Sequence, residues 1–98
     1  MINFFRKKQT EKIVIDNNSD KPLTISLEPW GEDYTLRAKE AVEIITEDCG
    51  QDFHFSIVYE VDYIAVYAEG NDNEYPRVYK NGEEVECGYN RNLSPFFL

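Results

Sequence analysis

Apolar and polar residues alternate along much of the chain, most clearly around one turn. Every second residue is apolar in 23–28, and the alternation resumes in 34–37. A period of two is typical of a strand that buries one face. Between these runs Pro29 lacks an amide hydrogen and Gly31 can adopt a positive φ, as a tight turn requires. The segment 27–36, LEPWGEDYTL, therefore predicts two strands joined at a Pro-Trp-Gly corner.

Trp30 lies in this corner, and its surroundings allow two interpretations. In the first, the indole folds back over the edge of the core and its ring nitrogen meets a carbonyl or water. In the second, Trp30 and Tyr34 stack on a carbohydrate or another small polar ligand. Glu28 and Glu32, which bracket the corner, would then fix the orientation of that ligand.

Further strands are predicted at 12–16, 42–45, 53–59, 64–68, 77–80 and 83–86. The run 12–16 is expected to form a hairpin with the strand after Pro22, across a loop of four or five residues. A turn or bulge at 60–62 divides the long apolar stretch 52–68 into two antiparallel strands, because few strands are that long. Asn81-Gly82 predicts a type I′ hairpin turn. A helix at 38–47 is an alternative to the third strand, but no helix caps are present.

These elements predict an all-β protein, a small antiparallel β-sandwich or partly open barrel of about seven strands. The architecture would be cupredoxin-like or immunoglobulin-like, with little or no helix. Ninety-eight residues make one domain, 1–98. Residues 1–11 are expected to be a basic N-terminal arm and 88–98 an apolar C-terminal tail. The Phe96-Phe97-Leu98 end would pack on the body or on a partner.

The charge is distributed unevenly. The chain carries a net charge of -9, yet residues 1–12 are basic, about +3, and the remaining 86 residues hold 6 basic and 18 acidic side chains. Such an acidic body repels phosphates, so nucleic acid is not expected as a partner. It either attracts a basic protein surface or serves solubility alone.

The compartment is inferred from what the chain contains. It has no apolar span of 18 residues, so no transmembrane helix is expected, and its start is the reverse of a secretory signal. We therefore expect a cytoplasmic protein without membrane association. In that compartment Cys49 and Cys87 would be free thiols.

Candidate chemistry is sparse. His54 is the single histidine and alternates with Phe53 and Phe55, which places it on the outer face of a sheet. Cys49, His54 and Cys87 lack the second histidine of a blue-copper site and have no recognisable zinc spacing. No phosphate-binding loop or nucleophile elbow is present. The sequence predicts no enzyme, no metal and no cofactor.

Three segments within residues 14 to 85 read Asn-x-Ser-x-x-Pro-Leu-Thr, then Leu-Glu-Pro-Trp-Gly-Glu-x-Tyr-x-Leu, then Arg-Val-Tyr-x-Asn-Gly-Glu-Glu-Val. Together they resemble a family of small, uncharacterised bacterial domains. In that family a Pro-Gly-Glu turn follows the corner, whereas residues 37–40 read Arg-Ala-Lys-Glu here. The resemblance implies a bacterial or phage-like setting and a compact β fold, and it carries over no catalytic residue.

Three hypotheses for function follow. The first is a non-catalytic interaction domain, such as an inhibitor or immunity-type protein, whose acidic and tyrosine-rich surface meets a basic protein. Its candidate contact residues are Tyr59, Tyr63, Tyr67, Tyr75 and Tyr79. The second is the small-ligand site at Trp30 and Tyr34. The third is a structural subunit, possible as a homo-oligomer, joined through sheet edges and the C-terminal tail.

Overall fold

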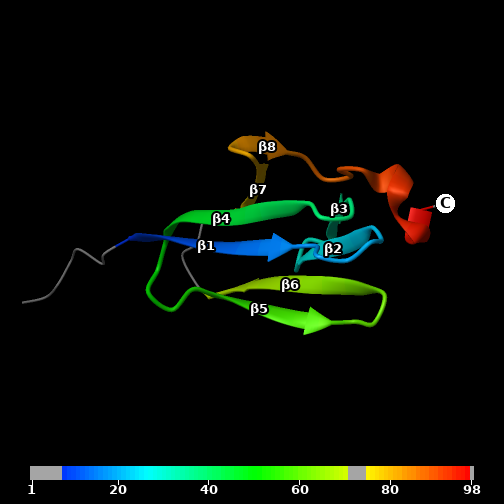
Figure 1. Cartoon of the computed structure of the whole chain (residues 1–98). Coiled ribbons are helices and arrows are strands. Elements are labelled where there is room, and N and C mark those ends of the chain that lie inside the picture. The colour runs from blue at the N-terminus through cyan, green and yellow to red at the C-terminus, as the bar shows by residue number, and fades with distance from the viewer. Residues whose placement is uncertain (1–7, 71–74, 98) are drawn as a thin grey trace, which may run out of the picture.

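Eight strands form two four-stranded sheets in the computed structural model, which describes residues 8–70 and 75–97 (Figure 1). The strands are β1 (Gln9–Asp16), β2 (Leu23–Glu28), β3 (Glu32–Leu36), β4 (Ala41–Cys49), β5 (His54–Tyr59), β6 (Tyr63–Glu69), β7 (Arg77–Lys80) and β8 (Glu83–Val85). Two 3-10 turns follow, η1 (Arg91–Leu93) and η2 (Pro95–Phe97). The predicted small all-β sandwich is confirmed, with eight strands in the described residues.

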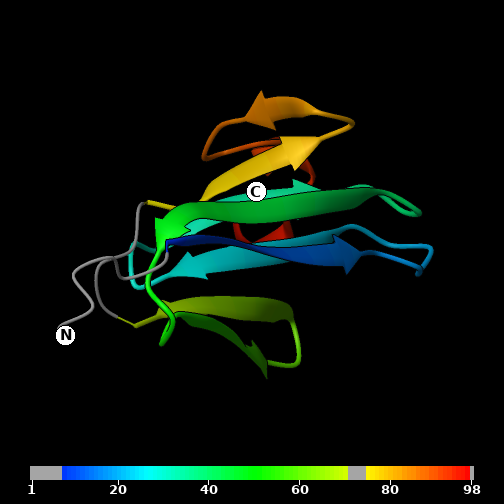
Figure 2. The same ribbon diagram turned by 90° about the vertical axis from the view of Figure 1, so that its left-hand side faces the viewer.

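The sheet orders are β1-β4-β7-β8 and β3-β2-β6-β5. Both views of the molecule place β7 and β8 on one side and β5 and β6 on the opposite side (Figures 1 and 2). All pairs are antiparallel except β2 and β6, which run parallel. The expectation of a wholly antiparallel fold is therefore wrong at this pair.

The predicted hairpin between β1 and β2 is also wrong, because these strands belong to different sheets. β1 pairs with β4, and the pairing continues past the end of the strand. The Asn17 amide donates to the Glu40 carbonyl at 2.8 Å, and the Lys39 amide donates to the Asn17 carbonyl at 2.8 Å. These backbone bonds hold the chain beside β4, so residues 17–22 must cross to the other sheet before β2 begins.

Four local predictions are confirmed. β2 and β3 form the hairpin around the corner, with Leu27 opposite Glu32 and Gly31 at a φ of 68°. Asn81 and Gly82 have φ values of 50° and 82°, as a type I′ turn between β7 and β8 requires. β5 and β6 are antiparallel and separated by residues 60–62. Residues 41–49 form a strand and no helix.

The core lies between the sheets and follows from the period of two. Its fully buried members include Ile25, Leu27, Leu36, Val42, Ile44, Val66 and Val78. Thr24, Asp33 and Thr35 face the other way and are nevertheless buried. Thr24 and Thr35 join their hydroxyl groups at 3.1 Å, and Thr24 donates to Ser94 at 2.9 Å. The C-terminal segment therefore covers the outer face of β2 and β3.

The described part of the C-terminal tail packs on the body. Phe96 meets Tyr63 edge to face with ring centroids 5.7 Å apart, although Phe96 stays half-exposed. Leu98 lies outside the described residues, as do residues 1–7 of the expected basic arm. Because β1 begins at Gln9, residues 9–11 belong to a strand, and the expected arm of residues 1–11 is too long. Across 8–70 and 75–97, no helix has the length and hydropathy needed to cross a bilayer.

Candidate functional site

The structure separates the nine predicted site residues into two groups. Glu32, Tyr34 and Tyr75 line a hollow where β3 faces β7 and β8, and Trp30 stacks on Tyr75 beside it. Tyr79 lines a second hollow, over β4 and β7, to which Tyr75 also contributes. The other four, Glu28, Tyr59, Tyr63 and Tyr67, lie on or beside the β2, β5 and β6 strands. Which tyrosines would meet could not be read from sequence, because it depends on the order of strands in the sheets.

The two hollows share Tyr75 and Arg77. One has a volume of about 490 Å³ and lies between β3 and the β7–β8 hairpin. The other, of about 230 Å³, lies over the ends of β4 and β7. Five carboxylates contribute to their lining, Glu32, Glu47, Asp48, Glu84 and Glu86. We call these five residues, together with Tyr75, Arg77 and Tyr79, the acidic groove.

Trp30 borders the acidic groove through Tyr75. The two rings stack with centroids 4.6 Å apart and planes tilted by 43°. Trp30 is 38% exposed and Tyr75 is 47% exposed, so water reaches both rings. The indole is therefore neither fully buried against the core edge nor fully open as a ligand platform. It packs on Tyr75, and part of its surface is exposed to solvent.

Tyr34 does not lie open beside Trp30. Its side chain is buried in the core, and its hydroxyl lies 3.3 Å from Glu32 Oε1, beside the larger hollow. Burial, with the nearby Glu32 carboxylate, raises the pKa of Tyr34 well above its ordinary value. The same causes raise the pKa of Tyr75 to about 12. Both phenols thus remain neutral hydrogen-bond donors at physiological pH.

Glu28 and Glu32 point to opposite faces of the hairpin. Glu32 lies opposite Leu27 in the strand register, on the core side. Glu28 accepts a hydrogen bond from the Ser26 hydroxyl at 2.6 Å, and these two residues share the outer face. The expected pair of carboxylates around one ligand is therefore not brought together.

The groove carries an excess of negative charge. Arg77 is its basic residue, and its guanidinium lies 3.6 Å from the Glu84 carboxylate. The remaining carboxylates, beside half-exposed aromatic rings, form a surface suited to cationic side chains. Carboxylates accept hydrogen bonds from ammonium and guanidinium groups, and aromatic faces attract the same cations.

Basic side chains gather at the opposite end of the sandwich, where Asp20 and Glu40 pair with two of them. A hollow of about 440 Å³ there is lined by Arg37, Lys39 and Lys80 around a buried Glu40. Glu40 forms an ion pair with Lys80 and accepts hydrogen bonds from the Tyr89 hydroxyl at 2.6 Å and the Arg37 amide at 2.7 Å. Burial opposes ionisation of Glu40, but these bonds hold its pKa below the ordinary value. Glu40 therefore has a structural role.

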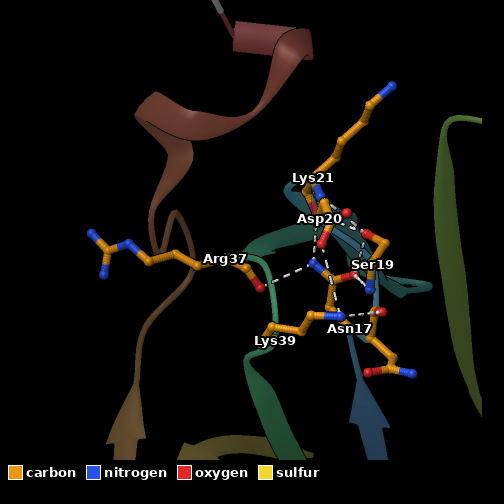
Figure 3. Close-up of polar contacts among 7 residues, drawn as sticks. Asn17, Ser19, Asp20, Lys21, Arg37 and Lys39 are labelled. Carbon is orange, nitrogen blue, oxygen red and sulfur yellow. Dashed lines mark hydrogen bonds and ion pairs between the residues drawn. The ribbon is translucent and has the colours of Figure 1, made fainter.

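Asn17 is a buried polar residue that sequence reasoning treated only as part of a loop. Its side-chain nitrogen, Nδ2, donates to the carbonyl of Lys21 at 2.7 Å and to the carbonyl of Arg37 at 2.9 Å (Figure 3). Its side-chain oxygen accepts hydrogen bonds from the backbone amide and the hydroxyl of Ser19. Asn17 is 3% exposed. The bond to Lys21 is local, as is common for asparagine in loops, whereas the bond to Arg37 spans 20 residues of the chain.

His54 and the two cysteines do not form a joint site. His54 is exposed on the outer face, as predicted, with Nε2 2.8 Å from Glu69 Oε1. Cys49 is buried and donates to the Gln9 carbonyl, Cys87 is exposed, and both thiols are free. In residues 8–70 and 75–97 no cluster of three His, Cys, Asp or Glu side chains could hold a metal ion.

Comparison of the chain with protein-family models, with curated proteins and with solved structures finds no match.

Proposed function

We propose that this chain is a non-catalytic interaction domain that binds a basic segment of a partner protein in the acidic groove. The observation that carries the proposal is the half-exposed Trp30–Tyr75 stack beside five groove carboxylates. An inhibitor or immunity-type protein would use such a surface to cover a basic site on its target. The proposal includes the bacterial, cytoplasmic setting expected from the sequence, in which the two thiols stay reduced.

Charge supports binding of a basic partner in two ways. The net charge of -9 accelerates the approach of a positively charged protein. The excess of carboxylates in the lining of the acidic groove then favours docking of a basic surface at that place. Aromatic rings supply contact area that a purely acidic surface lacks, and such rings dominate many binding hot spots.

Trp30 gives a direct test, because it is the single tryptophan of the chain. An arginine-rich peptide is titrated into the protein while the Trp30 emission is followed. We expect a saturable change in emission and an affinity that falls as salt is raised. An acidic peptide of equal length should leave the emission unchanged.

A pair of matched variants tests the location. Glu47→Lys with Glu86→Lys reverses two charges in the groove, and Asp16→Lys with Asp20→Lys makes the same charge change at the other end. The groove variant should lose peptide binding and the control should retain it. Equal loss in both would mean that only net charge matters and would contradict the proposed site.

The small-ligand alternative uses the same probe. A glycan that changes the Trp30 emission when the arginine-rich peptide does not would favour a carbohydrate site. The burial of Tyr34 leaves such a ligand one exposed indole in place of the expected two-ring platform. We therefore prefer a basic protein partner to a carbohydrate ligand. Pull-down from the native host with wild type and the groove variant as paired baits would then identify it.

A further inference from the structure

The four sheet edges among the described residues differ in how they are protected. Exposed edges invite pairing with other strands, and charged side chains oppose it. β1 carries Glu11, Lys12 and Asp16, and β8 carries Glu83 and Glu84. The β5 edge has the sequence HFSIVY, without Asp, Glu, Lys, Arg or Pro. The remaining edge is β3.

The β3 edge is covered by the chain itself. The Thr35 amide donates to the Tyr89 carbonyl at 2.9 Å, and the Gly88 amide donates to the Asp33 carbonyl at 2.7 Å. Tyr34 and Tyr89 also form a parallel bridge. Within residues 8–70 and 75–97, β5 is therefore the edge that is neither charged along its length nor covered.

β5 exposes apolar side chains on both faces. Ile57 is 47% exposed and Tyr59 is 71% exposed, and both share the face of the partly buried Phe55. Val58, on the opposite face, is 41% exposed. Side chains on the core-facing surface stay accessible because β5 lies at the border of its sheet, on the side away from β8 (Figure 2).

Val61, in the turn after β5, extends the same apolar edge. It is 75% exposed and has a φ of 70°, a conformation that costs a β-branched residue about 1 to 2 kcal/mol. Glycine or asparagine would fit this turn better. Nothing within the described chain explains an exposed valine in this conformation, whereas an apolar contact with another chain would.

The backbone of β5 presents its free groups at alternate residues. The Glu60 amide donates to the Tyr63 carbonyl of β6 at 2.8 Å. In an antiparallel ladder the bonding direction alternates, so the N–H and C=O groups of Phe55, Ile57 and Tyr59 point away from β6. These are the three residues through which another strand would pair.

We propose that β5 pairs antiparallel with β5 of a second copy of this chain, with Ile57 opposite Ile57 of that copy. This register places Phe55 opposite Tyr59 of the second copy on one face, an aromatic cross-strand pair. On the other face His54 lies opposite Glu60. The outward groups of Ile57 form a hydrogen-bonded pair across the two-fold axis, as do those of Phe55 and Tyr59. The result is one continuous eight-stranded sheet.

Self-complementarity decides between a second copy and an unrelated strand. In this register each apolar residue meets an apolar or uncharged one, and the terminal His54 meets an acid. Two copies of net charge -9 repel at long range, so raised salt should strengthen the dimer. A basic strand from another protein would show the opposite dependence, which also separates this surface from the acidic groove.

Sedimentation across a concentration series measures the association of the full chain. We expect wild type to form a dimer that tightens with salt. Ile57→Lys and Ile57→Glu should each raise the dimer dissociation constant at least about tenfold, because like charges then face each other across the axis. An equal mixture of the two variants should restore the dimer, since Lys then faces Glu. Only a register with position 57 opposite itself gives that rescue.

Controls keep the outcome decisive. Val14→Lys changes an equally exposed valine on the β1 edge and should leave the dimer unchanged. Circular dichroism confirms that each variant is folded, and Tyr59→Lys replaces any Ile57 variant that is not. A monomer at every concentration overturns the proposal. So does a dimer that the Ile57 and Tyr59 variants leave intact, or one that Val14→Lys disrupts equally.

Discussion

The Trp30 ring packs on the Tyr75 ring with centroids 4.6 Å apart, so the β2–β3 turn of one sheet meets the segment that leads into β7 of the other. An aromatic pair of this kind contributes about 0.5 to 1.5 kcal/mol beyond its area. Here it does so at the border of the acidic groove. The contact joins the two sheets and fixes the one indole of the chain beside the groove carboxylates.

Replacing Tyr75 should expose this indole. Tyr75→Ala is expected to shift the Trp30 emission to longer wavelength and to weaken binding of the arginine-rich peptide by about 1 kcal/mol. Tyr59→Ala removes an exposed tyrosine from the other sheet and serves as the control in the same fluorescence titration. An unchanged Trp30 emission in Tyr75→Ala would mean that the stack does not form in solution.

Asn17 should be the most sensitive polar position of the fold. Asn17→Ala removes the side-chain donor to the Arg37 carbonyl and one of two donors to the Lys21 carbonyl, which is expected to cost about 1 to 3 kcal/mol in the free energy of unfolding. Asn17→Asp should be at least as harmful, because an oxygen would then face those carbonyls. Urea unfolding measures both. The exposed neighbour Asn18→Ala should stay within about 0.5 kcal/mol of wild type, and an equal effect there would contradict the special role of Asn17.

The Asp33–Arg91 pair predicts a pH dependence. Arg91 donates to both Asp33 oxygens, at 3.0 and 2.5 Å, and these bonds hold the pKa of Asp33 below its ordinary 3.8. A lowered carboxyl pKa contributes stability above 3.8 that is lost as the pH falls through the folded-state value. Asp33→Asn should therefore be about 1 to 2 kcal/mol less stable than wild type at neutral pH, since half-exposed Arg91 is partly screened.

The same comparison at low pH tests the cause. As Asp33 becomes protonated in wild type, the difference in unfolding free energy between wild type and Asp33→Asn should shrink. Unfolding in urea over a series of pH values below 3.8 measures it. A difference that does not change with pH would mean that Asp33→Asn is less stable because its packing is altered, and not because the negative charge of Asp33 is lost.

His54 predicts a pH dependence of stability with the opposite sign. A hydrogen bond to the Asp52 carbonyl and one to Glu69 raise the pKa of His54 above 6.5. A raised histidine pKa contributes stability that is complete below 6.5 and is lost as the pH rises through the folded-state value. NMR titration of the single imidazole should give a midpoint above 6.5, and Glu69→Gln should lower it. A midpoint that Glu69→Gln leaves in place would assign the whole shift to Asp52.

Much of the fold was predictable because its signals are local. The alternation in 23–28 and 34–37, the Pro-Trp-Gly corner and the Asn81-Gly82 turn each fix their own hairpin. The partner of β1 was not predictable, because the β1–β4 ladder and the bonds from Asn17 to Glu40 and Arg37 join residues far apart in the chain. A period of two shows which face of a strand is buried and does not show which strand lies beside it.

The candidate site was predictable only in composition. An acidic, tyrosine-rich surface followed from residue counts, and Trp30 stood out at its corner. That Tyr75 would meet Trp30, while Tyr34 would enter the core, depends on how the two sheets pack. The β5 edge was missed for a related reason, since its alternating apolar residues predict a buried face whether or not the opposite sheet reaches far enough to cover it.

Val61 allows the backbone cost of the β5 edge to be measured. Val61→Gly should stabilise the monomer by about 1 kcal/mol, because glycine adopts a φ of 70° without strain. Gly31→Ala is the matched reference: Gly31 has a φ of 68° and open space around an added Cβ, so it should destabilise by a similar amount. Thermal unfolding at low protein concentration gives both values. If Val61 is kept for contact with a second copy, Val61→Gly must also weaken the dimer while it strengthens the monomer. A variant that strengthens both would separate this turn from the interface.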